Sequence, residues 1–313
     1  MKNKVVIGID TSNYTTSCAI CDTNGVVLEN YKELLPVKDG EKGLRQSDAV
    51  FAHVKNFQII SSKIKEKHED YEIVAIGYSA YPRDAAGSYM PCFLVGQAVS
   101  EMIASLYNIY SFHFSHQAGH IQAALYSAKL NSNEPFVAFH VSGGTTEILL
   151  VTPKEGGYDI SLIGGSDDLN AGQAIDRIGV HMGIPFPCGK QIENLAQSNT
   201  KKIPKCKICT KDLSCNLSGL ENMAIKLYKE TNDEYLVAAF TLEFISRTLE
   251  QLTDVIKQKY GDIKVVYAGG VMSNKIIQSN LAKKFENVYF SEPEFSSDNA
   301  CGIAILTYKK FIK

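Results

Sequence analysis

The chain has 313 residues, of which 45% are hydrophobic and 21% are charged, and its formal net charge at pH 7 is −2. This composition is normal for a globular protein of one large domain or two lobes. It shows no global bias toward nucleic acid, although a local basic patch between residues 201 and 211 stays open. No apolar run approaches the ~20 residues that span a membrane, and residues 1–10 carry no cleavable signal pattern. We therefore expect a cytoplasmic protein without a membrane partner, whose eight cysteines are thiols or metal ligands rather than disulfides.

Two parts of the chain carry the same strand pattern, with turns between the apolar runs. In the first half the predicted strands are residues 5–9, 16–21 and 26–29. In the second half they are residues 136–141, 147–151 and 158–163. The repetition favours an α/β protein with duplicated lobes, although β-meanders are common enough for coincidence to compete.

Helical periodicity dominates between and after these strand units. The predicted helices are residues 91–108, 171–183, 189–198, 217–230, 234–259 and 298–312, with one more beginning near Asn274 after a strand at 264–268. Residues 34–48 and 200–216 are predicted to be long loops. We expect an N-terminal lobe of residues 1–130 plus a C-terminal helix 298–313, and a C-terminal lobe of residues 131–297.

Two histidines, His116 and His120, stand four residues apart ahead of an apolar run. On a helix, residues i and i+4 share one face, so both rings can reach one metal ion. Two histidines make an incomplete site, and Asp298 is the best candidate for the third ligand. The competing interpretation is an ordinary helix with two partly exposed histidines.

The same histidine spacing occurs in zinc peptidases, which place a glutamate directly after the first histidine as general base. Here that position is Gln117, followed by Ala118, and neither can take a proton from water. The motif therefore argues against a metallopeptidase but not against metal binding.

Three turns at strand ends are suited to a phosphate or a nucleotide. The first is Asp10-Thr11-Ser12-Asn13, and the second is Ser142-Gly143-Gly144-Thr145. Successive backbone N–H groups in such turns can bind an anion, and glycine allows close approach. The third, Gly269-Gly270 followed by Asn274, joins a strand to a helix, which is a natural anion or ribose site. A single one of these turns would be an ordinary tight turn, but together they favour nucleotide binding in the C-terminal lobe.

Four cysteines could hold a structural zinc ion. Cys206, Cys209 and Cys215 lie within ten positions, and Cys188 could supply a fourth thiolate to a tetrahedral site. Only one C-x-x-C pair is present, so free thiols in a loop remain the competing interpretation.

The order of the motifs resembles the TsaD family, from about residue 4 to residue 310. The motifs that carry the resemblance are Gly8-Ile9-Asp10-Thr11-Ser12, His116-x-x-Gly119-His120, Val141-Ser142-Gly143-Gly144-Thr145, Asp168-x-x-Ala171-Gly172-x-Ala174-x-Asp176, Leu217-Ser218-Gly219-Leu220, Ala268-Gly269-Gly270-Val271-x-x-Asn274 and Ser297-Asp298-Asn299-Ala300. The resemblance implies the two-lobed actin/sugar-kinase/heat-shock-chaperone (ASKHA) fold. It also implies transfer of a threonylcarbamoyl group from an adenylate to N6 of the adenosine beside the anticodon of certain tRNAs.

For the site, the resemblance implies iron or zinc held by His116, His120 and Asp298. It implies an adenine nucleotide, ATP or an acyl-adenylate, in contact with residues carried over by motif. These are Val141, Ser142, Gly143, Gly144, Thr145, Asp176, Gly189, Glu193 and Asn274. Taken alone, Asp176 would be an acidic residue favoured by a helix N-terminus. A TsaB-like protein and tRNA are the partners that the resemblance suggests.

The chain departs from the family pattern around the metal triad. Ala118 replaces the acidic residue of His-x-Glu-Gly-His, and Thr145 replaces the histidine of Ser-Gly-Gly-His-Thr. Residues 82–88 and 187–190 replace two glycine-rich family loops. This pattern is expected of a divergent paralogue with a changed acceptor or donor. The alternatives are a carbamoyltransferase acting on a small molecule, and a non-catalytic nucleotide-binding paralogue that pairs with a TsaB-like protein.

Overall fold

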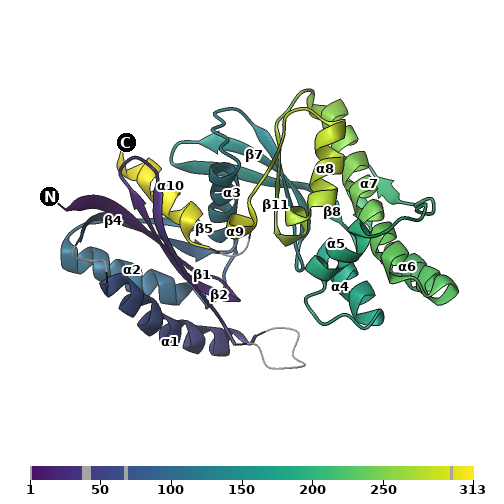
Figure 1. Cartoon of the computed structure of the whole chain (residues 1–313). Helices are drawn as coiled ribbons and strands as arrows, with labels where there is room; N and C mark the ends of the chain where they lie inside the picture. Colours follow the sequence, from purple (N-terminus) through teal and green to yellow (C-terminus); the bar gives the residue numbers. More distant parts are fainter. Residues whose placement is uncertain (1, 37–43, 67–69, 297–298) are drawn as a thin grey trace. The chain divides into compact units, whose positions relative to one another are not determined.

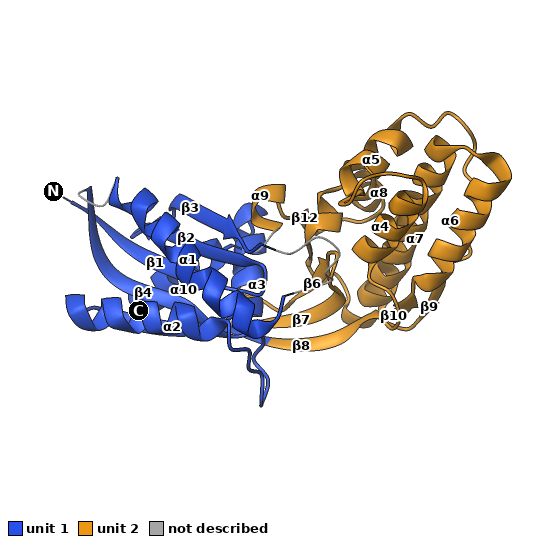
Figure 2. Ribbon diagram, turned by 90° about the horizontal axis from the view of Figure 1, so that it is seen from below, with its two compact units in different colours: residues 1–131, 153–159, 297–313 blue, residues 132–152, 160–296 orange. Residues whose placement is uncertain are grey.

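The computed structural model describes residues 2–36, 44–66, 70–296 and 299–313 (Figure 1). The chain divides into two compact units (Figure 2). Unit 1 comprises Met1–Asn131, Pro153–Asp159 and Ser297–Lys313, and unit 2 comprises Ser132–Thr152 and Ile160–Ser296. Each unit has its own sheet, its own covering helices and its own hydrophobic core.

Unit 1 is built on a five-stranded sheet in the order β3-β2-β1-β4-β5. The strands are β1 (Asn3–Thr11), β2 (Thr15–Asp22), β3 (Val27–Leu34), β4 (Tyr71–Tyr81) and β5 (Tyr110–Ser115). The first three strands form an antiparallel meander, and β1 pairs with β4 in parallel. Residues 5–11 of β1 are all buried, as expected of a central strand covered on both faces.

Helices cover the two faces of this sheet. They are α1 (Gln46–Lys65), α2 (Phe93–Tyr107), α3 (His116–Ser127) and α10 (Cys301–Phe311). Figure 1 shows α1 and α2 on one face and α10 on the other. The contact with α10 is close because β1 has a glycine there: a Cβ on Gly8 would lie 2.3 Å from the backbone nitrogen of Ala304. The last helix of the chain therefore packs directly on its first strand.

Unit 2 repeats this strand order within a seven-stranded sheet, β12-β11-β6-β7-β8-β10-β9. The strands are β6 (Phe136–Val141), β7 (Thr146–Lys154), β8 (Gly157–Ser166), β9 (Cys209–Lys211), β10 (Ser214–Asn216), β11 (Val265–Ala268) and β12 (Val288–Phe290). The segment β12-β11-β6-β7-β8 has the order of β5-β4-β1-β2-β3 in unit 1, with the parallel pairs in the same places. The structure thus confirms the predicted duplication.

The helices of unit 2 pack around the 27-residue helix α7 and its largely buried side chains. The elements are α4 (Ala171–His181), α5 (Gly189–Gln197), α6 (Ser218–Thr231), α7 (Glu234–Tyr260), the 3₁₀ turn η2 (Gly270–Ser273), α8 (Lys275–Lys284) and α9 (Pro293–Ser296). The predicted helices at 171–183, 189–198, 217–230 and 234–259 are confirmed to within two residues at each end.

Residues 200–216 are not the continuous loop that the sequence predicts. Strands β9 and β10 form a hairpin there, with Cys209 opposite Asn216 and Lys211 opposite Ser214. The turn between them is tight because Asp212 adopts a left-handed backbone conformation, with φ of 53°. Strand β10 then pairs in parallel with β8, which joins the hairpin to the sheet.

Candidate functional site

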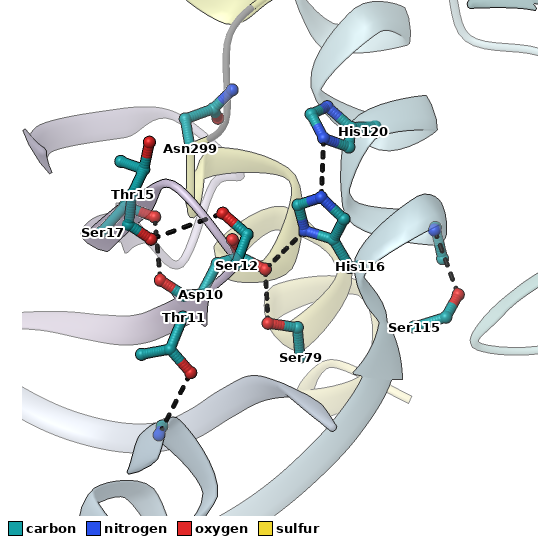
Figure 3. Close-up of polar contacts among 12 residues, drawn as sticks. Asp10, Thr11, Ser12, Thr15, Ser17, Ser79, Ser115, His116, His120 and Asn299 are labelled. Carbon is teal, nitrogen blue, oxygen red and sulfur yellow. Dashed lines mark hydrogen bonds and ion pairs between the residues drawn. The ribbon is translucent and has the colours of Figure 1, made fainter. Parts of the chain in front are cut away.

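The two predicted metal ligands lie on the first turns of α3. His116 is the first residue of the helix, and the hydroxyl of Ser115 caps it by accepting a hydrogen bond of 3.1 Å from the amide of Ala118. Figure 3 shows the two imidazoles facing one another, with their Nε2 atoms 2.9 Å apart. The helix therefore brings together the two nitrogen atoms that the sequence assigned to a metal.

Asp10, at the end of β1, holds the ring of His116 from the other side. Its Oδ1 lies 2.8 Å from His116 Nδ1, and it also accepts a hydrogen bond from the Ser79 hydroxyl on β4 (Figure 3). A carboxylate on Nδ1 fixes the tautomer whose Nε2 carries a lone pair, which is the usual support of a metal-binding histidine. This role of Asp10 was not predicted from the sequence. The feature that could have indicated it is an acidic residue directly after the buried run of residues 5–9.

The environment of Asp10 favours a cation nearby. Its side chain is only 1% exposed, and its Oδ2 has no hydrogen-bond partner among the residues that the structure describes. A buried carboxylate that is incompletely solvated is costly unless opposite charge compensates it. The donor set of two imidazoles backed by this carboxylate therefore fits a divalent metal.

The third predicted ligand, Asp298, lies outside the described residues. Its neighbour Asn299 is buried, and its Oδ1 accepts a hydrogen bond of 3.0 Å from the amide of Cys301 at the start of α10. Within the described ranges, no three His, Cys, Asp or Glu side chains are gathered so that they could hold a metal. The complete metal triad remains a prediction.

Helix α3 is fixed in place by a glycine contact with α10. A Cβ on Gly302 would lie 1.8 Å from the carbonyl oxygen of Gly119, which is the residue before His120. A Cβ on Gly119 would lie 2.9 Å from Cδ1 and 3.1 Å from Cγ1 of Ile303, whereas the backbone nitrogen of Ile303 would be 3.9 Å away. The two helix backbones thus touch beside the histidine pair, so the position of α10 sets the position of both imidazoles.

Thr11 and Ser12, predicted as nucleotide contacts, are buried at the end of β1. The Thr11 hydroxyl donates to the carbonyl of Cys92 at 3.0 Å and accepts from the amide of Gly96 at 3.3 Å. The Ser12 hydroxyl donates to the carbonyl of Thr15. The Thr11 side chain joins β1 to the start of α2, so the structure supplies a packing role for it.

In unit 2, the predicted turn at residues 141–145 follows β6 directly. The amide of Ser142 donates to the carbonyl of Thr145 at 2.7 Å, and the amide of Gly172 donates to the carbonyl of Ser142 at 3.1 Å. These bonds fix the turn against the N-terminus of α4. A Cβ built on Gly143 or Gly144 meets no atom of the described chain within 4 Å, so this stretch of backbone is open to a ligand.

Gly269 and Gly270 follow β11, the parallel neighbour of β6, and so lie at the same edge of the sheet. Gly269 has φ of 99°, and a Cβ on it would lie 2.3 Å from the carbonyl oxygen of Val141. Only glycine allows this approach. Asn274 caps α8, since its Oδ1 accepts from the amides of Ile276 and Ile277 at 3.0 and 3.1 Å.

Asp176, Gly189 and Glu193 are linked to this edge by hydrogen bonds. Asp176 Oδ1 accepts from the amide of Cys188 at 2.8 Å, directly before Gly189 at the start of α5. Glu193 is buried, and its Oε1 accepts from the amide of Lys275 at 2.7 Å, next to Asn274. The turns at residues 141–145 and 269–270 thus lie at the carboxyl ends of β6 and β11, where doubly wound α/β sheets bind ligands. Asp176 is bonded to the start of α5, and Glu193 joins α5 to the start of α8.

Asp176 also lines a cavity of about 470 Å³ between α4 and α6. Phe186 and Val180 supply apolar surface to this cavity, and both are more than half exposed. Burial raises the pKa of Asp176, although the hydrogen bond from Cys188 opposes the shift. In the described chain the second oxygen of this carboxylate, Oδ2, has no protein hydrogen bond, so it is free to accept from a ligand hydroxyl.

The structure does not assemble the predicted cysteine zinc site. Cys188 is buried against Gly179 of α4, whereas Cys209 is exposed on the β9–β10 hairpin. Cys215 is opposite Thr210 and Cys209 is opposite Asn216, so these two side chains point to opposite faces of the hairpin. Burial raises the pKa of Cys206 to about 11 and that of Cys215 to about 12, which disfavours the thiolate form that binds metal.

The departures from the family pattern have defined places. Ala118 is 4% exposed, and its side chain packs in the interior of unit 1. The loop at residues 82–88 is fixed to α3, because the carbonyl of Pro82 accepts from the amide of Gln117 at 3.0 Å and Asp84 accepts from the Ser115 hydroxyl at 2.7 Å. The altered loop therefore lies beside the histidine pair.

Across the part of the chain that the structure describes, no helix is both long and apolar enough to cross a bilayer. The fold itself is widespread among solved structures. One is component A of the Acidaminococcus fermentans (R)-2-hydroxyglutaryl-CoA dehydratase, with a TM-score of 0.57, 17% identity and 99% coverage of each chain. Another is a ROK family glucokinase from Streptomyces griseus, with a TM-score of 0.53, 12% identity, and 97% and 99% coverage. The duplicated strand order and these neighbours show that the protein has the ASKHA fold.

Sequence comparison identifies the family to which the chain belongs within this fold. Residues 48–305 match the family described as "TsaD: tRNA N6-adenosine threonylcarbamoyltransferase", and the chain belongs to this family of acyl transferases. A relative of that name from Streptococcus equi subsp. zooepidemicus (strain MGCS10565) is 26% identical, over 100% of this chain and 94% of its own length. Another, from Thermosipho melanesiensis (strain DSM 12029 / CIP 104789 / BI429), is 27% identical over 98% and 95%. The family that the sequence motifs indicated is confirmed.

Proposed function

We propose that this protein transfers a threonylcarbamoyl group from an acyl-adenylate to N6 of the adenosine beside the anticodon of tRNA, in the cytoplasm. The observation that carries the proposal is the pair of Nε2 atoms of His116 and His120, 2.9 Å apart and backed by Asp10. Family membership and the full-length relatives supply the reaction class.

The metal in this proposal is iron or zinc, held by His116, His120 and Asp298. Such an ion acts as a Lewis acid toward an acyl carbonyl. Asp10 and Ser79 hold the His116 ring in the orientation that binding requires. The Gly302 contact holds α3, and therefore both rings, in register with Asp10.

An adenine nucleotide is proposed to bind unit 2 at the carboxyl ends of β6 and β11. The backbone at Gly143 is open and can donate an N–H group to a phosphate or carboxylate oxygen, and the amide of Gly144 can do so in place of its 3.3 Å hydrogen bond to the Ser142 hydroxyl. Asp176 can accept from a ribose hydroxyl through its Oδ2, and the adjacent cavity of about 470 Å³ can take a purine against Phe186. Glu193 and Asn274 support this edge by fixing the start of α8.

A TsaB-like protein is the proposed partner, docked on unit 1. Leu94, Ala98, Met102 and Leu106 recur every fourth residue along α2, and all four are exposed. The neighbouring helix α1 exposes Phe51 and Val54. An apolar stripe of this length on a helix is typical of a protein interface.

The second candidate function is carbamoyl transfer to a small molecule. It is favoured by Thr145, which has no group that titrates near neutrality where the family pattern has a histidine. Retention of the histidine pair argues against the third alternative, a non-catalytic nucleotide-binding paralogue.

The test is a transfer assay with purified protein, threonylcarbamoyl-adenylate and an unmodified tRNA transcript, with and without a TsaB-like partner. Mass spectrometry of the nucleosides should detect N6-threonylcarbamoyladenosine. His116→Ala/His120→Ala should lower the product by at least ~10²-fold. If the adenylate is consumed but no modified adenosine forms, the result would refute tRNA as the acceptor and support a small-molecule acceptor. No consumption by the folded, metal-loaded protein would refute both.

A further inference from the structure

A lysine-rich stretch of unit 2 leads from the end of α5 into strand β9. We call residues 201–211 the lysine segment. It contains Lys201, Lys202, Lys205, Lys207 and Lys211, all exposed, and no acidic residue. Ile203, Cys206 and Ile208 alternate with these lysines and pack against the core of unit 2. The apolar side chains thus anchor the segment, and the lysines are presented outward along its length.

Both ends of the lysine segment are fixed. At its start, Asn199 forms a turn by donating to the carbonyl of Lys201 at 2.8 Å and accepting from its amide at 3.1 Å. At its end, residues 209–211 are the strand β9, paired with β10. A ligand that binds this segment therefore pays little ordering entropy, because the backbone is already placed.

Most other lysines of unit 2 have a carboxylate partner within 4.0 Å. These include Lys190, Lys226, Lys257, Lys259, Lys264 and Lys284. In the lysine segment only Lys201 has such a partner among the described residues, Asp233 at 2.7 Å. The remaining four lysines concentrate positive charge in a protein whose net charge is −2.

Three acidic groups near the segment are already paired. Asp233 binds Lys201, and Asp212, the residue after the segment, lies 3.9 Å from Lys259. Glu243, which influences Cys206, is bound by Arg247 at 2.6 Å. Local carboxylates thus leave the positive potential of the other four lysines in place, which is the electrostatic signature of a polyanion site.

RNA fits this surface better than an anionic membrane does. Membrane-surface segments insert apolar side chains, but Ile203 and Ile208 are turned into the core. A cavity of about 560 Å³ begins at Lys201, and its lining includes Tyr228 and Tyr235 together with Asp233 and Glu234. Aromatic rings beside a basic track are typical of single-stranded nucleic acid sites, where rings stack on bases and lysines bind phosphates.

We propose that the lysine segment binds the phosphate backbone of the acceptor RNA, with Lys202, Lys205, Lys207 and Lys211 as the contacts. The inference rests on the proposed function for the identity of that RNA. It adds a docking surface on unit 2 that the histidine pair and the nucleotide residues do not supply.

The test compares two variants of the full-length protein that lose the same charge. One is Lys202→Gln/Lys205→Gln/Lys207→Gln/Lys211→Gln. The matched control is Lys226→Gln/Lys229→Gln/Lys283→Gln/Lys284→Gln, which removes four exposed lysines elsewhere in unit 2. Binding to an unmodified tRNA transcript is measured by fluorescence anisotropy across a salt series. A third variant with arginine at the four segment positions keeps the charge.

The segment variant should lose tRNA affinity about 10–100-fold at low salt, with a salt slope smaller by about one for each lost phosphate contact. The control and the arginine variant should bind like wild type. Equal losses in the segment variant and the control would overturn the inference, because net charge alone would explain them. Unchanged tRNA affinity, with lost binding to phosphatidylglycerol-containing vesicles, would overturn it in favour of a membrane.

The assay separates this inference from the proposed function. If the protein fails to modify tRNA but still binds RNA through the lysine segment, the docking surface is supported. The same result counts against tRNA adenosine as the acceptor of the transferred group. Normal tRNA modification and normal affinity in the segment variant would overturn the docking surface and leave the proposed function standing.

Discussion

The contact between α3 and α10 predicts a large effect for Gly302→Ala. The added Cβ would lie 1.8 Å from the carbonyl oxygen of Gly119, whereas real Cβ contacts essentially never fall below 3.0 Å. The helices would have to separate by roughly 1 Å, because a helical carbonyl cannot rotate away from a close-packed interface. Overpacking of this kind costs about 1–3 kcal/mol, and we expect the upper end. Alanine's higher helix propensity offsets about 1 kcal/mol of it.

We therefore expect Gly302→Ala to lower the free energy of unfolding by about 2 kcal/mol in urea titrations. Because α3 carries His116 and His120, metal content after purification should also fall. Gly119→Ala is the matched control, since its Cβ would be close only to side-chain atoms of Ile303, with the backbone nitrogen of that residue 3.9 Å away. An unfolding midpoint for Gly302→Ala equal to wild type, with normal metal content, would refute the claim that this contact fixes the histidine pair.

Three further predictions address separate groups. Asp10→Asn should weaken metal binding about 10–100-fold without unfolding the protein, as measured by competition with a chelator; unchanged affinity would show that His116 needs no carboxylate support. Asp176→Ala should weaken adenine-nucleotide binding by ~1–3 kcal/mol in calorimetry, and equal affinity would place the ribose elsewhere. Burial lowers the pKa of His53 from 6.5 to about 4, so its stabilising contribution is complete above pH 6.5 and is lost as the pH falls toward 4. Between pH 7 and pH 5 the free energy of unfolding should therefore fall by ~2 kcal/mol more in wild type than in His53→Gln, and parallel profiles would contradict the burial argument.

The elements with regular apolar periodicity could be predicted from sequence, but α1 could not. This helix buries His53 and Asn56, which bond to Thr16 at 2.8 and 3.1 Å, and it exposes Phe51 and Val54. Its buried face mixes these two polar residues with Ala49, Ala52 and Ile60, so it departs from the usual rule of apolar residues inside and polar residues outside. Periodicity is weak there because a buried polar network contributes to the contact between α1 and β2, beside the apolar packing.

Local spacing predicted the histidine pair, because i and i+4 fix a shared helix face without tertiary information. The support from Asp10 could not be derived this way, since Asp10 and His116 are 106 positions apart in the chain. The same limit applies to the cysteines. Their spacing suggested a zinc site, but strand pairing sends Cys209 and Cys215 to opposite faces. Sequence proximity predicts a ligand set only when one element carries all its members.

The packing of α10 on β1 has a consequence for synthesis on the ribosome. Residues 132–296, which contain all of unit 2, emerge before residues 301–311, whereas the sheet of unit 1 is complete only when α10 covers Gly8 and Gly77. Unit 2 can thus fold during translation, but unit 1 keeps an uncovered apolar face until its helix is made. A ribosome that stalls before residue 301 would release a chain in which unit 2 can fold. In that chain α3 would lack α10, the helix against which it packs. Chaperone capture should therefore concentrate on nascent unit 1, and ribosome profiling of chaperone-bound chains can measure it.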